Sequence, residues 1–162
     1  MIKPGDRIPT FTIKRLVDGA QADVSTDAYF AGKRVVMFTV PGAFTGVCSK
    51  IHLPGYVEQA SALKAKGVDD VICLAVNDSL VMGAWADKAG ATGKVTMLAD
   101  GNALVTRALG LDYDASAGGM GAVRCRRAAL VVKDGVVESI EVEDKNPEVT
   151  VSGAAACLAR LG

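Results

Sequence analysis

Two short and almost uninterrupted apolar runs constrain the fold more than any other feature of the sequence. RVVMFTV (residues 34–40) and DVICLAVN (residues 70–77) are rich in β-branched side chains, a pattern typical of strands that are covered on both faces. A helix-length segment, residues 49–66, lies between them. Strand, helix and strand in this order predict a βαβ unit, whose crossover is right-handed in nearly all known cases.

An alternating pattern precedes this unit and a helical pattern follows it. Apolar and polar side chains alternate on either side of Asp18-Gly19, which predicts an N-terminal hairpin. Residues 79–89 predict a helix, with Ser79 as its N-cap and Trp85 on its inner face. The α/β alternation of the central unit therefore continues along the chain.

The C-terminal half of the chain predicts a strand, two helices and a second hairpin. VTMLAD (residues 95–100) has the pattern of a strand and ALVTRAL (residues 103–109) that of a helix. Alternating runs flank Asp134-Gly135, the strongest hairpin signal in the chain, and residues 152–161 predict a closing helix. These elements predict an α/β fold in which helices flank a central mixed β-sheet on both faces.

Length and charge limit the number of domains and the class of partner. The chain has 162 residues and 50% hydrophobic content, which suits one compact domain spanning residues 1–162. Eighteen basic and eighteen acidic residues give a formal charge of zero, so nothing steers the chain to nucleic acid or to a membrane surface. No apolar stretch approaches the ~20 residues that span a bilayer, and we expect a cytoplasmic protein.

The cysteines are widely spaced. The sequence contains Cys48, Cys73, Cys125 and Cys157 and no C-x-x-C pair, which argues against both a disulfide framework and a zinc knuckle. We therefore expect four reduced thiols.

One of these thiols stands at a position suited to chemistry. In VPGAFTGVCSK (residues 40–50), Cys48 follows the end of a predicted strand and begins a predicted helix, where unpaired N–H groups favour the thiolate form. Thr45 can direct a hydroxyl at the same point, and Pro41 supplies a rigid wall without a donor. Ligands of open α/β sheets bind at this edge, outside the carboxyl ends of the strands.

A thiolate that attacks a neutral substrate also needs a cation that keeps its charge. RCRR (residues 124–127) leads into the late hairpin, and an arginine there can face the thiol across the sheet. We expect Arg127 to be this cation, because Arg124 and Arg126 could equally be solvated residues at the sheet edge.

The segment PGAFTGVCS, followed by HLPGY, resembles the active-site segment of the peroxiredoxins, specifically the atypical type II (type 5-like) subfamily. The similarity extends through VICLAVND, AWA, MLAD and RRAALVVKDG and so covers almost the whole chain. It implies a thioredoxin-like fold and a thiol peroxidase that reduces hydrogen peroxide and organic hydroperoxides. It also implies that no metal and no organic cofactor is required.

The resemblance assigns roles to individual residues. Cys48 matches the peroxidatic cysteine, which becomes a sulfenic acid. Thr45 matches the hydroxyl that positions thiolate and peroxide, Pro41 the shield of the pocket, and Arg127 the distal arginine. Two further residues, Gly46 and Val47, belong to the peroxide-binding loop by the same match.

Two other features near the thiol have competing interpretations. His52 lies one turn after Cys48, which suggests a Cys–His dyad, but its spacing points it down the helix, and in the family it belongs to a structural H-L-P-G turn. Pro54 and Gly55 are expected to kink this helix and to let its first turn unwind. SAGGMGA (residues 116–122) lacks a phosphate-binding signature and is expected to form a flexible rim.

The sequence also bears on how oxidised Cys48 is recycled. Type II members with two cysteines carry a resolving cysteine before the last helix, but Val151 stands at about that position here. Cys157 falls in an apolar helix, and Cys73 and Cys125 have the pattern of buried or bystander thiols. We therefore expect an external thiol, glutathione with glutaredoxin or thioredoxin, to reduce Cys48, with Cys157 as the alternative resolver.

Two other classes of function would also use a reactive thiol and are alternatives to a peroxidase. A thioredoxin-type disulfide oxidoreductase is excluded, because the residue three after Cys48 is Ile51. A redox sensor or a chaperone-like module without turnover would use the same thiolate. A homodimer is expected, because Phe44, Leu80 and Val81 are apolar at a loop edge that should be wet, although burial within one chain is the competing explanation.

Overall fold

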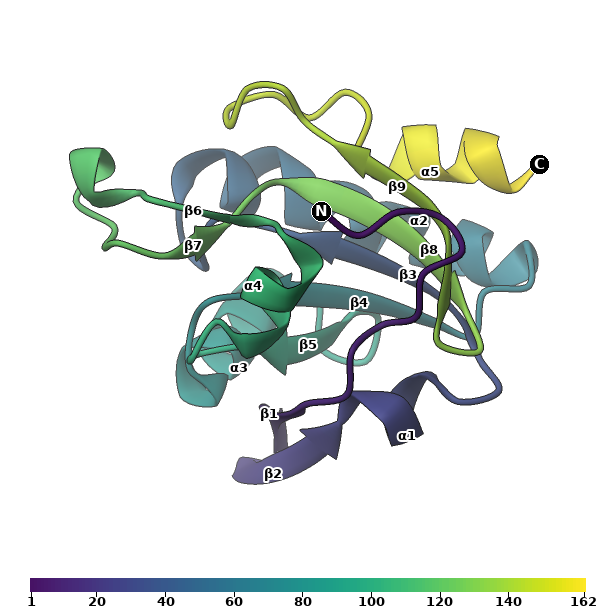
Figure 1. Ribbon diagram of the computed structural model, residues 1–162, viewed down its shortest axis with the longest axis horizontal. Coiled ribbons are helices and arrows are strands. Elements are labelled where there is room, and N and C mark those ends of the chain that lie inside the picture. Colours follow the sequence, from purple (N-terminus) through teal and green to yellow (C-terminus); the bar gives the residue numbers. More distant parts are fainter.

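The computed structural model describes residues 1–162 and contains a seven-stranded mixed sheet with helices on both faces (Figure 1). Its strands are β1 (Thr12–Val17), β2 (Ala20–Ser25), β3 (Arg34–Thr39), β4 (Asp70–Ala75), β5 (Thr96–Ala99), β8 (Ala128–Lys133) and β9 (Val136–Val142). They follow the order β2-β1-β5-β4-β3-β8-β9. Two short strands, β6 (Asp112–Tyr113) and β7 (Arg124–Cys125), form a separate two-stranded sheet.

The helices are α1 (Thr26–Phe30), α2 (Leu53–Ala65), α3 (Ser79–Lys88), α4 (Leu104–Leu109) and α5 (Ala154–Leu161). A π-helical turn (Cys48–His52) precedes α2, and a 3-10 turn (Ser116–Gly118) lies between β6 and β7. None of these helices has the length and hydropathy that crossing a bilayer requires.

The centre of the sheet explains the two apolar runs. β3 pairs in parallel with β4 and antiparallel with β8, so that Met37 lies between Ile72 and Leu130. Side chains of β3 alternate between two cores: Phe38 packs with α2, α3 and α5, while Met37 packs with α1, α4 and the N-terminal segment. A strand enclosed in this way is apolar on both faces, and the predicted mixed sheet flanked by helices is confirmed.

Both predicted hairpins are present, and their turns have the backbone geometry that their sequences favour. Asp18 and Gly19 have φ of 49° and 80°, and Asp134 and Gly135 have φ of 48° and 77°. Two successive positive φ angles make the tight turns that match strand twist. The hairpins form the β2 and β9 edges of the sheet.

The start of α3 differs from the prediction. Asp78, not Ser79, is the N-cap, and its carboxylate accepts a hydrogen bond of 2.9 Å from the Val81 N–H. Asp78 has extended backbone angles, whereas Ser79 is already the first helical residue and donates its hydroxyl hydrogen to Gln21. Trp85 is buried, as predicted.

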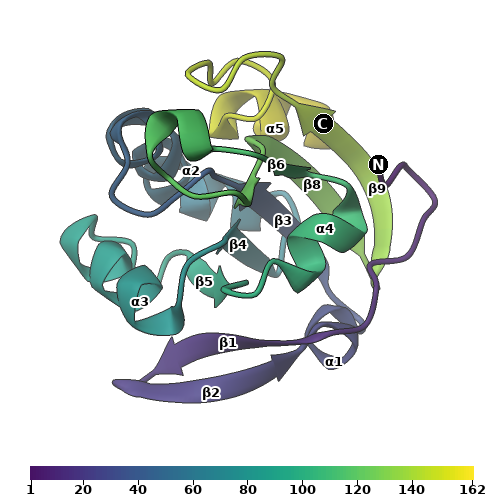
Figure 2. The same ribbon diagram turned by 60° about the vertical axis from the view of Figure 1, so that its left-hand side comes forward.

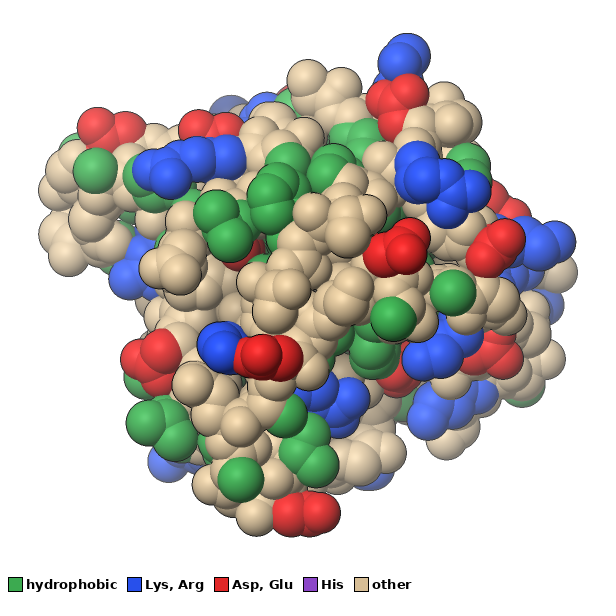
Figure 3. Space-filling model, turned by 60° about the horizontal axis from the view of Figure 1, so that its bottom comes forward, with side chains coloured by type: hydrophobic (Ala, Val, Ile, Leu, Met, Phe, Trp, Pro, Cys, Tyr) green, Lys and Arg blue, Asp and Glu red, His purple; other side chains and the backbone are tan.

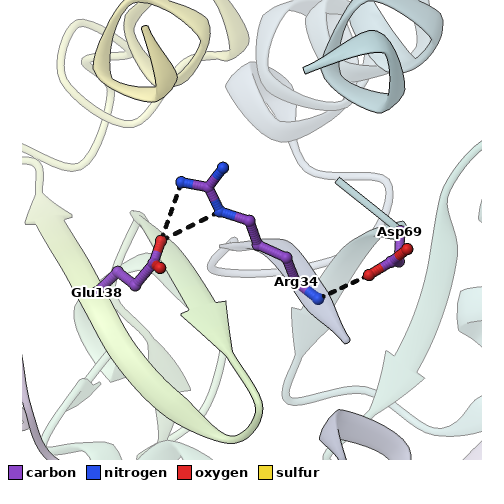
Figure 4. Close-up of polar contacts among 3 residues, drawn as sticks. All are labelled: Arg34, Asp69 and Glu138. Carbon is purple, nitrogen blue, oxygen red and sulfur yellow. Dashed lines mark hydrogen bonds and ion pairs between the residues drawn. The ribbon is translucent and has the colours of Figure 1, made fainter. Parts of the chain in front are cut away.

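An ion pair fixes the amino-terminal end of β3 (Figure 4). The guanidinium of Arg34 donates two hydrogen bonds to one carboxylate oxygen of Glu138 on β9, at 3.2 and 3.1 Å. The backbone N–H of Arg34 donates to the carboxylate of Asp69, just before β4. On the face of the molecule shown in Figure 3, acidic and basic side chains are interspersed rather than segregated by sign.

Candidate active site

The loop after β3 is held against the end of β4, because parallel strands bring their carboxyl ends to one edge. The Ala43 N–H donates to the Asn77 side-chain oxygen at 2.9 Å, and Val40 N–H donates to the Leu74 carbonyl. Pro41 and Gly42 are buried in this loop, and the role of Pro41 as a wall of the pocket stays a prediction. Phe44 has a φ of 62°, a strained conformation for a bulky residue of the kind found at functional loops.

Cys48 begins the π-helical turn and is 1% exposed. The Leu53 N–H donates to the Cys48 carbonyl, five residues back, which closes this wide turn. The indole N–H of Trp85 donates to the Ser49 hydroxyl at 3.0 Å and ties the turn to α3. The irregularity that was predicted at Pro54 and Gly55 therefore lies one turn earlier, and Pro54 occupies the first turn of α2, where a missing N–H is tolerated.

Arg127 meets the thiol, as predicted. Its Nη2 donates to Cys48 Sγ at 3.2 Å, its Nε donates to the Asn146 carbonyl at 2.8 Å, and its Nη1 lies 2.9 Å from His52 Nδ1. The side chain is 3% exposed and forms no ion pair with any carboxylate. A buried guanidinium without a counter-ion stabilises a negative charge on the sulfur beside it.

The chain is held so that Arg127 turns toward the thiol. Arg127 lies in the break between β7 and β8. The Thr39 hydroxyl at the end of β3 donates to the Arg126 carbonyl at 2.7 Å, and the Glu143 N–H donates to the Arg127 carbonyl at 2.9 Å. Both flanks of the arginine are therefore anchored to the sheet.

His52 supports Arg127 rather than the thiol. Because a guanidinium only donates, Nδ1 of His52 accepts from Arg127 and Nε2 carries the hydrogen donated to the Ser152 carbonyl at 3.0 Å. Burial, together with the nearby Arg127 charge, lowers the pKa of His52 to about 3. A neutral imidazole with both nitrogens occupied and no hydrogen bond to Cys48 does not form a Cys–His dyad.

The segment that carries Ser152 is organised by one carboxylate. Burial alone would raise the pKa of Glu143, but hydrogen bonds from Ser152, Thr150 and Val151 hold it below its usual value. Glu143 accepts from the backbone N–H groups of all three residues and from the hydroxyls of Thr150 and Ser152. The carbonyl that orients His52 is therefore fixed in turn.

Thr45 lies in the loop as predicted, but its hydroxyl does not bond the thiol. It donates to the Gly42 carbonyl at 2.7 Å, within the same loop. With its hydrogen occupied, the Thr45 oxygen can only accept a further hydrogen bond from a ligand. Gly46 is exposed, and Val47, half-buried, is the residue before the π-helical turn.

Arg124 is a site residue that the sequence analysis treated as a possible solvated edge residue. Its Nε donates to the Met120 carbonyl at 2.8 Å, and its Nη1 donates to the Val76 carbonyl at 3.1 Å and lies 3.5 Å from the Pro41 carbonyl. One guanidinium thus joins the active-site loop, the end of β4 and the glycine-rich rim. A Cβ on Gly42 would lie 3.0 Å from Arg124 Nη1, so a larger residue there would require the guanidinium to shift by a few tenths of an ångström.

The glycine-rich rim lies beside the start of α2 in both ribbon views (Figure 1, Figure 2). Its 3-10 turn, residues 116–118, contains no buried residue. The structure therefore places this segment at the border of the site, and its flexibility stays a prediction.

The other three cysteines are buried and unpaired. Burial raises the pKa of Cys73 well above the ordinary value, that of Cys125 to about 12, and that of Cys157 in the same direction. These thiols are held in the protonated, less nucleophilic form. No three His, Cys, Asp or Glu side chains gather as a metal-binding group.

Comparison with known proteins agrees with this geometry. The Redoxin family profile matches residues 3–158. Peroxiredoxin-2B of Arabidopsis thaliana is 44% identical over 154 residues, which cover 94% of each chain. Chloroplastic Peroxiredoxin-2E-2 of Oryza sativa subsp. japonica is 44% identical over 155 residues, which cover 93% of this chain and 69% of that relative.

A solved structure extends the comparison to the fold. Reduced Prx3 of Vibrio vulnificus in complex with hydrogen peroxide superposes with a TM-score of 0.94, at 42% identity and with 100% of both chains covered. This chain is a peroxiredoxin, a member of the redoxin family. The peroxiredoxin has the thioredoxin-like fold that the resemblance implied, and it is a thiol peroxidase that uses a peroxidatic cysteine. The prediction of an enzyme is confirmed, whereas the roles of individual side chains stay predictions.

Proposed function

We propose that Cys48 is the peroxidatic cysteine of a type II peroxiredoxin and that Arg127 is its principal electrostatic partner. The observation that carries this proposal is the 3.2 Å contact between Arg127 Nη2 and Cys48 Sγ, made by an arginine without a counter-ion. The solved relative from Vibrio vulnificus was captured with hydrogen peroxide, and the same substrate class, with organic hydroperoxides, is proposed here.

The reaction requires one displacement at oxygen. The Cys48 thiolate attacks one peroxide oxygen, a sulfur–oxygen bond forms, and the oxygen–oxygen bond breaks. The departing hydroxide or alkoxide takes a proton and leaves as water or alcohol, while Cys48 becomes a sulfenic acid. Charge moves from sulfur to the departing oxygen, and Arg127 stabilises it along this path.

The loop residues position the peroxide. Thr45, whose hydrogen is donated to Gly42, accepts a hydrogen bond from the hydroperoxide O–H. Pro41 and the backbone at Gly46 and Val47 enclose the substrate. Cys48 is almost fully buried, and unwinding of the π-helical turn exposes the oxidised sulfur to a bulkier reductant.

An external thiol completes the cycle. The structure contains no disulfide, Val151 stands at the place of a resolving cysteine, and burial raises the pKa values of Cys73, Cys125 and Cys157. None of these thiols is activated to attack oxidised Cys48. We propose glutathione as the attacking thiol, with glutaredoxin or thioredoxin completing the reduction in a reducing compartment such as the cytoplasm.

A homodimer is proposed from exposed apolar side chains beside the site. Phe44 is 49% and Leu80 is 65% exposed, and the Ala43–Asn77 hydrogen bond brings their two segments together. Val81 packs against the core instead and contributes less to such a surface. Sedimentation of wild type and Phe44→Asp tests this, because a wild type that is monomeric in dilute solution removes the proposal.

The function itself is tested by stoichiometric oxidation. Wild type treated with one equivalent of hydrogen peroxide should gain one oxygen on Cys48, detected by intact and peptide mass, and glutathione should then give a mixed disulfide on Cys48. Cys48→Ser should lose peroxidase activity, while Cys157→Ser keeps it. Peroxide consumption by Cys48→Ser, or a Cys48–Cys157 disulfide formed before glutathione is added, would contradict the proposal.

A further inference from the structure

A small cavity lies against the arginine that contacts the thiol. It has a volume of about 180 Å³ and is lined by Tyr113, Arg126, Arg127, Glu143, Asp144 and Asn146. Arg127 is shared, since it lines the cavity and also donates to Cys48 Sγ at 3.2 Å. One guanidinium group therefore separates the cavity from the reactive sulfur.

Most polar groups of the cavity are already engaged within the chain. Glu143 accepts from the segment that follows it, and Arg127 donates to three partners. The Asn146 amide donates to the Tyr113 hydroxyl at 3.0 Å. These contacts shape the walls and leave these groups little capacity for a ligand.

Two charges of opposite sign remain unused. The guanidinium of half-buried Arg126 and the carboxylate of exposed Asp144 form no hydrogen bond and no ion pair, either with each other or with another residue. A cavity with one free cation and one free anion is complementary to a zwitterion. An α-amino-acid group presents a carboxylate to the arginine and an ammonium to the aspartate.

We propose that this cavity binds the α-amino-acid end of a low-molecular-weight thiol, of which glutathione is the type, and so directs its sulfur to oxidised Cys48. The inference rests on the proposed function, in which Cys48 is the residue oxidised. The glutamyl end of glutathione lies about two residues, ~7 Å, from its thiol, a reach that suits a subsite one guanidinium away from the sulfur.

The chemistry of this step is balanced. The thiolate of the bound reductant attacks Cys48 Sγ, a sulfur–sulfur bond forms, and the sulfur–oxygen bond of the sulfenic acid breaks. The hydroxide leaves and takes a proton to become water. A second thiol then attacks the mixed disulfide and releases reduced Cys48.

The test compares two thiols on the oxidised enzyme. Arg126→Gln and Asp144→Asn should each slow reduction by glutathione about five- to tenfold through loss of one charged contact. Reduction by 2-mercaptoethanol, which has no α-amino-acid group, should change less than about twofold. Two matched control substitutions lie outside the cavity, Arg107→Gln on α4 and Glu148→Gln in the same loop as Asp144. Either thiol should reduce both oxidised control variants at the wild-type rate.

Four outcomes overturn the subsite. If the variants are reduced equally slowly by both thiols, or if peroxide oxidises their Cys48 more slowly by the same factor, the substitutions disturb Arg127 and not the binding of a ligand. Wild-type behaviour of both variants with glutathione would show that the cavity is not used. Reduction by glutaredoxin or thioredoxin alone, with no reaction with free glutathione, would assign the step to a protein. In each case the Cys48→Ser result still decides the proposed function separately.

Discussion

Two arginines at opposite ends of the same strand region have opposite electrostatic surroundings. Arg34 begins β3, and its guanidinium is neutralised by Glu138, with side chains that are 31% and 35% exposed (Figure 4). Arg127 lies beyond the carboxyl end of β3 and is 3% exposed, yet its partners are a thiol, a neutral imidazole and a carbonyl. The half-buried arginine has a counter-ion, and the fully buried one has none.

We propose that this difference separates a structural arginine, Arg34, from a functional one, Arg127. A surface ion pair contributes little to stability, about 0.2–1 kcal/mol. A buried cation without a carboxylate is costly to maintain, but it remains available to the anion that forms on Cys48 and then on the peroxide oxygen. We expect substitutions at the two ends to differ accordingly.

The largest effect is expected at Arg127. Arg127→Gln should lower the second-order rate constant of Cys48 with hydrogen peroxide about 10²–10³-fold, because a preorganised donor to the developing charge is lost. Stopped-flow oxidation of the reduced enzyme measures this rate. Arg34→Gln is the matched control and should stay within about twofold of wild type. A reduced rate of similar size for both variants would show that the loss reflects folding.

A smaller effect is expected at Arg124, which holds backbone instead of charge. Arg124→Gln should lower the peroxide rate about tenfold, because the Pro41–Gly42 turn loses a partner and the loop is displaced. Gly42→Ala should act in the same direction, since its Cβ would crowd Arg124. Full activity in both variants would remove Arg124 from the site.

The two arginines also differ in how far the sequence predicts them. Arg127 was found because a thiol at a helix start requires a cation and because the motif resembles a known family. Arg124 has the same side chain three residues earlier, but its role depends on three carbonyls, of which those of Pro41 and Val76 belong to segments distant in the chain and only that of Met120 is close in sequence. No local pattern encodes such a convergence.

Other parts of the fold show the same division. Periodicity predicted the strands and hairpins, since alternation and Asp-Gly turns are local signals. The sequence predicted a kink at Pro54 and Gly55, whereas the irregular turn lies one turn earlier, at Cys48–His52, because it depends on tertiary anchors such as the Trp85–Ser49 hydrogen bond. The tautomer and hydrogen-bond partners of His52 could not be predicted either, because they depend on Ser152, a hundred residues away in the chain.

The buried imidazole beside Arg127 should also make the stability of the protein depend on pH. His52 is the only histidine of the chain, so its titration can be followed without interference from another imidazole. Burial lowers its pKa to about 3 in the folded state, while about 6.5 is expected when unfolded. Below pH ~6.5 the unfolded state binds a proton that the folded state does not, so stability is complete above this pH and falls as the pH drops.

The expected slope is about 1.4 kcal/mol per pH unit in the fully developed range. Urea denaturation of wild type at several values between pH ~7 and ~5 measures it. His52→Gln should show an almost flat profile in this window. An equal slope in the variant would mean that another group is responsible.

The smallest effect is expected at the neutralised end of the strand. Glu138→Gln should lower the free energy of unfolding by about 0.2–1 kcal/mol, because it removes the counter-ion of Arg34. The peroxide rate should not change, since Glu138 lies far from the thiol along the strand. A clear loss of activity in this variant would contradict the separation of the two ends.

The most direct test gives Arg127 the kind of partner that Arg34 already has. His52→Glu places a carboxylate beside Arg127 Nη1, and His52→Gln places a neutral amide of the same shape there, so the pair differs in charge and in the N–H donor that the amide carries. The rate constant of Cys48 with hydrogen peroxide should be at least about tenfold lower for His52→Glu than for His52→Gln, because the carboxylate neutralises the cation. Equal rates in the two folded variants would contradict the claim that an uncompensated Arg127 charge drives the reaction.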